Sequence, residues 1–197
     1  AAATAPTWTS GWPKAENTTP SGFTAKVNIS AAGTSYFVVL PNGATAPTSA
    51  QVKAGQDATS TAVASGMAGT IACAAASTEY TSAVTGLSSS TTYNVYFVAE
   101  ASSTLQASPV MVSVTTGSSA SAPSITSLTV GSVTDNSAVL GANVTSDGGD
   151  AITARGTLWK TSAGVTISDN LLEEGTDATG VFTHSRTSLP AETQIFY

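Results

Sequence analysis

Few side chains in this sequence could perform nucleophilic chemistry. The 197 residues include one histidine, His184, and one cysteine, Cys73. A Cys-His pair needs both side chains in contact, but these two lie in different halves of the chain, at positions with a strand pattern. Serine is abundant, yet no Gly-x-Ser-x-Gly motif occurs. We therefore expect no catalytic residue and no enzymatic activity. Cys73 is interpreted as a small buried residue, with a free thiol or an intermolecular disulfide as the alternative.

Acidic residues that could hold a metal form only two small groups. Calcium takes six to eight oxygen ligands from acidic loops, and neither group has the spacing of an EF-hand. We favour solvated turns, with calcium as the alternative, and expect no metal site and no cofactor. The groups are Asp147 and Asp150, which flank a Gly-Gly turn, and Glu173 and Glu174, which precede Gly175 and Asp177.

Two tryptophans near the N-terminus are candidates for an interaction surface. Trp8 and Trp12 lie in the stretch TWTSGWP, residues 7–13. Trp is favoured at subunit interfaces, and exposed aromatic rings can stack on sugars, so glycans are possible partners. The interpretation we favour is structural, with both rings covering one end of a first domain.

The composition excludes several kinds of partner. Hydrophobic residues make up 41% of the chain, so it can form a core, whereas only 9% is charged and the net charge is −6. A chain this poor in Lys and Arg has no electrostatic footprint for nucleic acid or anionic lipid.

No apolar stretch approaches the roughly 20 residues that span a bilayer. The N-terminal AAATAP is compatible with a mature end left by signal-peptide cleavage.

Alternating apolar and polar residues predict an all-β protein of two domains. Segments of six to eight residues with period 2, separated by turn residues, are typical of half-buried strands and of β-sandwiches. No segment shows a helical period. The small polar stretch at residues 116–123 predicts a linker between a first domain, 1–116, and a second, 117–197. The predicted strands cover residues 23–30, 36–40, 93–100, 110–115, 138–145 and 152–159.

The two halves also share a spacing of residues, which indicates a tandem repeat. In the first half, Tyr80, Ser82, Val84 and Leu87 are followed six residues later by Tyr93. The second half has the same spacing in Phe182, His184, Arg186, Leu189 and Ile195. A weaker parallel links residues 46–55 with residues 165–175.

The stretch GLSSSTTYNVYFVA, residues 86–99, resembles the fibronectin type III-like domains of bacterial surface and secreted proteins. Residues 33–52 and 151–162 are similar to the same family, so the resemblance covers most of the chain. It implies two tandem sandwiches. In this family Leu87 would end one strand, and the hydroxyl of Tyr93 would bond back to nearby backbone as a structural tyrosine corner.

The second half departs from this pattern at its end. Ile195 replaces the corner tyrosine, Arg186 replaces Val84, and Tyr197 aligns with Val95. By this alignment the second sandwich lacks most of its sixth strand and all of its seventh. Either the chain is part of a longer protein, or a neighbouring subunit supplies the strand by β-strand addition, with residues 1–8 as a possible donor. Ile195, Phe196 and Tyr197 are therefore candidate interface residues.

These features predict a non-enzymatic extracellular module, structural or adhesive, within a prokaryotic surface protein or filament. Its expected partners are further copies of itself or other surface proteins. The alternative is an accessory spacer in a secreted polysaccharide-degrading enzyme.

Overall fold

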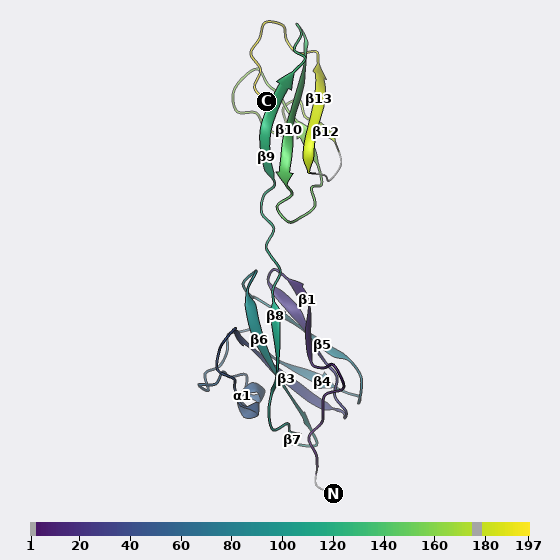
Figure 1. Ribbon diagram of the computed structural model, residues 1–197, viewed down its shortest axis with the longest axis vertical. Coiled ribbons are helices and arrows are strands. Elements are labelled where there is room, and N and C mark those ends of the chain that lie inside the picture. Colours follow the sequence, from purple (N-terminus) through teal and green to yellow (C-terminus); the bar gives the residue numbers. More distant parts are fainter. Residues whose placement is uncertain (1–2, 175–178) are drawn as a thin grey trace. The chain divides into compact units, whose positions relative to one another are not determined.

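The chain forms two compact all-β units. The computed structural model describes residues 3–174 and 179–197. The first unit comprises Ala1–Ser119 and the second Ala120–Tyr197. Nearly all regular structure is antiparallel β-strand (Figure 1), which confirms the predicted fold class of tandem fibronectin type III-like sandwiches.

Part of the expected linker belongs to the first unit. Thr116 is buried, and its Oγ1 donates to the carbonyl of Ser88 at 2.7 Å. The N–H of Gly117 donates to the carbonyl of Thr19 at 2.9 Å. On the other side, the N–H of Ser121 donates to the carbonyl of Gly148 at 2.8 Å, within the second unit. These bonds hold both ends of the expected linker to the adjoining unit.

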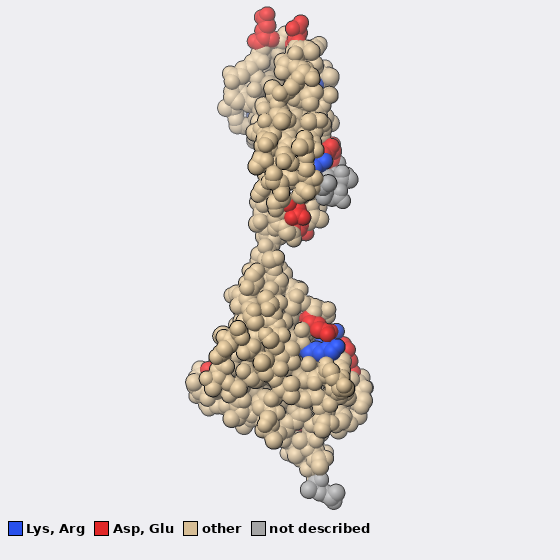
Figure 2. Space-filling model, viewed as in Figure 1, with Lys and Arg blue, Asp and Glu red and all other residues tan. Residues whose placement is uncertain are grey.

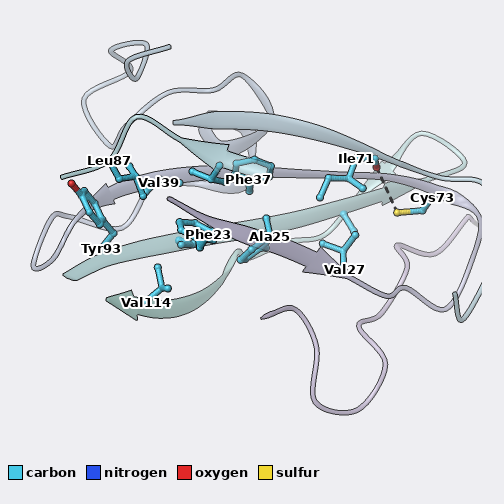
Figure 3. Close-up of a cluster of buried hydrophobic side chains, with 14 of the residues drawn as sticks. Phe23, Ala25, Val27, Phe37, Val39, Ile71, Cys73, Leu87, Tyr93 and Val114 are labelled. Carbon is cyan, nitrogen blue, oxygen red and sulfur yellow. Dashed lines mark hydrogen bonds between the residues drawn. The ribbon is translucent and has the colours of Figure 1, made fainter. Parts of the chain in front are cut away.

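The first unit packs two sheets around a shared core. One sheet has the order β1 (Lys14–Thr19), β2 (Gly22–Val27), β5 (Tyr80–Thr85). The other has β4 (Ala68–Cys73), β3 (Gly33–Pro41), β6 (Thr92–Ala101) and β7 (Thr104–Leu105), with β8 (Val110–Thr115) also paired to β6. Alternate residues of both sheets point inward, so Phe23, Val27, Phe37, Val95 and Phe97 meet in one hydrophobic core. Figure 3 shows part of this cluster.

One short helix, which the sequence analysis did not predict, accompanies the strands of the first unit. Helix α1 (Ser49–Lys53) makes a single turn. Thr48 caps it, because the Thr48 side chain accepts from the Gln51 backbone N–H while the Gln51 side chain accepts from the Thr48 backbone N–H. This is the Thr-x-x-Gln capping box. Five residues are too few to display a hydrophobic period, so only the cap could have indicated the helix.

The second unit contains one complete three-stranded sheet and a smaller opposing pair. Strands β9 (Ser124–Gly131), β10 (Ser137–Ser146) and β13 (Gly180–Thr187) form the sheet, with β10 in the middle. Among the described strands, β11 (Arg155–Thr157) pairs with β12 (Leu172–Glu174) alone. The predicted strand over residues 152–159 is therefore wrong in length: only three residues pair with β12, and Lys160 adds one isolated bridge to Phe196.

The repeat inferred from residue spacing corresponds to equal strand registers. In the first unit, Val27 pairs with Tyr80, Ala25 with Ser82 and Phe23 with Val84. In the second, the same three positions are Ala142 with Phe182, Leu140 with His184 and Ala138 with Arg186. The two units can therefore be compared residue by residue.

Candidate functional site

The second unit has an open apolar face along strand β9 and the residues that follow it. Ile125, Leu128, Val130 and Val133 are 57%, 65%, 52% and 68% exposed. In the first unit, by contrast, strand β8 lies next to β1 as well as pairing with β6, and Val112 and Val114 pack into the core. Among the described residues of the second unit, no strand occupies the place of β8. We call Ile125, Leu128, Val130, Val133 and Tyr197 the open face.

Two hollows follow this face. The larger, about 600 Å³, has Val130, Val133 and Tyr197 in its wall, together with Leu189 and Ile195. The smaller, about 160 Å³, is bordered by Ile125 and Leu128 and by the following residues: Gly141, Ala142, Gly156, Thr157, Leu158, Phe182 and Tyr197. Tyr197 lines both. The hollows therefore lie along β9 and reach the side chains that form the core of this unit.

The three C-terminal candidates lie beside this face in different environments. Phe196 exchanges two backbone hydrogen bonds with Lys160, at 2.8 and 2.9 Å. This bridge corresponds to the pairing of Asn94 with Leu40 in the first unit. Ile195 packs on the small core cluster that contains Leu140 and Leu189, whereas Tyr197 is 42% exposed. The segment thus begins a strand beside residue 160.

The two N-terminal tryptophans pack on the first unit. Trp8 meets Phe97 edge-on, with ring centroids 6.4 Å apart, and forms an isolated bridge with Ile29. Trp12 is partly exposed, and the Lys14 Nζ lies 5.1 Å from its ring centre. Pro6 accepts a hydrogen bond from the Gln106 side chain. A donor strand drawn from residues 1–8 would have to give up these contacts.

The corner residues of the first unit have the geometry expected of a tyrosine corner. The Tyr93 hydroxyl accepts a hydrogen bond from the backbone N–H of Ser88 at 3.0 Å. Leu87 is buried beside it, and Figure 3 shows both side chains at one end of the core. The contact ties the start of β6 to the residues that follow β5.

A polar cluster inside the second unit was missed by sequence reasoning. His184 is buried, with its Nδ1 3.0 Å from the Thr157 Oγ1 and its Nε2 3.5 Å from a Glu174 carboxylate oxygen. Arg155 also pairs with Glu174. Arg186 is buried next to Thr157. The signal was in the repeat: His and Arg stand at inward positions where the first unit has Ser82 and Val84.

Cys73 lies inside the first unit. It is buried and free, and its Sγ donates to the carbonyl of Ile71 at 3.5 Å, drawn as a dashed line in Figure 3. The Ser35 Oγ lies 3.6 Å from the sulfur. The residue therefore behaves as a small core side chain with weak polar contacts.

The acidic groups are engaged in local contacts. Asp147 accepts from the N–H of Gly149 at 2.9 Å, and Asp150 from the N–H of Ala151 at 2.9 Å, as in ordinary turns. Glu173 is exposed, whereas Gly175 and Asp177 lie outside the described residues. Across residues 3–174 and 179–197, no three His, Cys, Asp or Glu side chains are close enough to hold a metal ion.

Comparisons with known proteins add little beyond these observations. No family profile matches the chain, and no curated protein matches it. Among solved structures, a two-domain fibronectin type III segment from chicken tenascin is similar over 98% of this chain and 87% of that one, at 13% identity and a TM-score of 0.34. Within the described residues, no helix is long and apolar enough to cross a membrane.

Proposed function

We propose that this chain is a non-enzymatic structural or adhesive module of an extracellular surface protein or filament. In this proposal its second unit takes up a β-strand from a neighbouring subunit. The observation that carries the proposal is the open face, because the equivalent strand of the first unit, β1, lies next to β8. The place for a strand is defined by the protein's own repeat.

The bound strand would replace water on both the side chains and the backbone of this unit. Fully burying one Val, Leu or Ile side chain contributes about 1.5–3 kcal/mol, and the open face holds four such residues, each more than half exposed. An uncovered strand edge is a template for pairing with another chain. Main-chain hydrogen bonds would supply affinity, and apolar side chains at alternate positions would supply register.

The surface charge is compatible with close packing of copies. Only 9% of the residues are charged, and on the face seen in Figure 2 they form a few small groups. Several charged residues of the chain pair locally, such as Lys26 with Glu16 at 3.2 Å and Lys53 with Glu100 at 2.7 Å. Few charges would therefore have to be desolvated when subunits meet.

Light scattering of the 197-residue polypeptide over a range of concentrations tests the proposal. We expect the wild-type chain to self-associate, and Leu128→Ser to weaken association strongly by removing one anchor of the open face. Met111→Ser is the matched control, because Met111 is 50% exposed on the first unit, outside the open face. A wild-type chain that stays monomeric throughout, or an equal effect of both substitutions, would overturn the proposal.

A further inference from the structure

Arg186 is a buried cation that contacts no carboxylate among the residues that the structure describes. The residue is only 7% exposed. Its guanidinium donates to the carbonyl of Asn170 and lies 3.4 Å from the carbonyl and 3.5 Å from the hydroxyl of Thr157. All of these partners are neutral, and the two contacts to Thr157 are long for hydrogen bonds. A guanidinium has five N–H donors, so part of its capacity is unused.

Glu174, an acidic residue of this unit, is already engaged by other side chains. Glu174 pairs with Arg155 through one carboxylate oxygen, while the other lies 3.5 Å from His184. Burial lowers the pKa of Arg186, as expected for a charge taken out of water. The first unit has Val84 at the equivalent position and needs no counter-charge there. The arginine is thus a special feature of the second unit.

Arg186 lines a hollow that opens to solvent. The hollow measures about 520 Å³, and its other walls are Trp159, Asn170, Leu171, Leu172, Ser185, Thr187 and Ser188. Ser185 and Thr187 belong to β13, which is the end strand of its sheet. Every second residue of an end strand turns its N–H and C=O away from its only neighbour. Hydroxyls, unpaired backbone groups and a buried guanidinium therefore lie around one opening.

We infer that this hollow binds a carboxylate carried on an extended acidic peptide segment. A carboxylate can accept two parallel N–H bonds from the arginine fork. The peptide backbone would add along the free edge of β13, and Leu171 and Leu172 would contact its apolar side chains. The free strand edge favours a peptide over a sugar acid, which would use only the guanidinium and hydroxyls. This site is separate from the open face on β9 and does not depend on strand exchange there.

Titration calorimetry with short blocked peptides tests this site on the 197-residue chain. The probe is acetyl-Thr-Val-Glu-Val-Thr-amide, and the control peptide has Gln in place of Glu. We expect the Glu peptide to bind at least about tenfold more tightly, the loss expected when a charge-assisted bidentate contact is replaced by a neutral one. Sodium glucuronate is the third ligand and represents a sugar acid.

Two variants and one control assign the binding to Arg186. Arg186→Met should abolish the preference for Glu over Gln, and its folding is checked by Trp159 fluorescence. If that variant does not fold, Arg186→Lys keeps the charge without the fork and should weaken Glu-peptide binding about tenfold. Lys160→Met removes a cation from the same unit and should leave binding unchanged.

The outcomes separate the inference from its alternatives. Equal binding of the Glu and Gln peptides, no binding of either, or unchanged binding by Arg186→Met or Arg186→Lys would overturn it. Glucuronate binding without peptide binding would show a sugar-acid site and would also overturn the peptide assignment. Because the open face is untouched by these variants, loss of self-association would not imitate the expected result.

Discussion

The two units share a strand register but differ in what fills it. In the first, Phe23 opposes Val84 inside a core that β6 and β8 close. In the second, Ala138 opposes Arg186 at the equivalent place, and the described residues provide no strand in the position of β8. The first unit thus has two apolar side chains at this pair of positions, whereas the second has a small side chain opposite a long cationic one. The same backbone pattern can therefore support a closed core or a partly polar, open one.

The two units differ in the interactions that stabilise them. The first unit buries large apolar side chains from both sheets, among them Phe37 and Phe97. The second unit's interior divides into two small apolar clusters, and the polar cluster of His184 and Arg186 lies on the same inner face of β13. A core of this kind gains less from apolar burial and depends more on satisfied polar contacts. We therefore expect the second unit to be the less stable of the two.

Core truncation should produce the largest effects and should separate the units. Phe97→Ala is expected to destabilise the first unit by about 3–5 kcal/mol because it leaves a cavity in a closed core. Leu140→Ala in the second unit should cost about 2 kcal/mol, at the low end of such changes, because the adjoining hollows let the site collapse. Urea unfolding monitored by tryptophan fluorescence checks this, and comparable losses in the two units would contradict the contrast.

Removing the shared carboxylate should produce the next effect. Glu174→Gln removes the carboxylate that Arg155 and His184 share, so we expect the second unit to lose about 1–3 kcal/mol. The measurement is the midpoint of the Trp159 transition. Glu173→Gln is the matched control, since Glu173 is the exposed neighbour on the same strand. Equal behaviour of the two variants would show that the polar cluster does not support this unit.

The tyrosine corner should contribute a smaller amount to the first unit. Tyr93→Phe removes the hydroxyl that accepts from Ser88 and should cost about 1 kcal/mol, the typical net value of one hydrogen bond. The second unit has Ile195 at this place and lacks the contact. Thermal unfolding of the first unit measures the change, and an unchanged melting temperature would show that the corner adds no stability.

The smallest effect concerns acid stability of the first unit. The Lys53 ammonium beside Glu100 lowers the pKa of that carboxyl below 4.5, its ordinary value. A lowered pKa means that the contribution is present above pH 4.5 and is lost as the pH falls through the lowered value. In Lys53→Met the free energy of unfolding of the first unit should therefore fall less steeply as the pH is lowered. The measurement is the urea midpoint at several pH values between neutral and acidic. The same pH dependence in the wild type and in Lys53→Met would contradict the pairing.

Much of the fold could be predicted from the sequence because strand patterns are local. Alternation placed β2, β6, β8 and β10 closely, and equal spacing indicated the register that the two units share. Helix α1 was not predicted because a single turn has no measurable hydrophobic period. Strand β11 was predicted too long because the length of a strand depends on the strands that pair with it. Pairing across a sheet is a tertiary property that a single segment does not encode.

The candidate site was only partly predictable for the same reason. The alignment of the repeats indicated Ile195, Phe196 and Tyr197 as candidate interface residues, but the exposure of Ile125 and Leu128 on β9 depends on what covers them. His184 was interpreted as a simple strand residue. The repeat spacing could place His184 at an inward position, but its contacts with Thr157 and Glu174 join three separate strands and could not be deduced from spacing.

Hydrogen exchange of the 197-residue chain at several concentrations tests most directly whether the second unit needs a strand from a neighbour. Strands β6 and β8 serve as the internal reference, because the first unit is closed at every concentration. We expect amides of β9 and of residues 195–197 to become more protected as concentration rises, while those of β6 and β8 do not change. The need for a neighbour's strand would be contradicted if, at the lowest concentration, amides of the second unit were already as protected as those of the first and gained no protection at higher concentration.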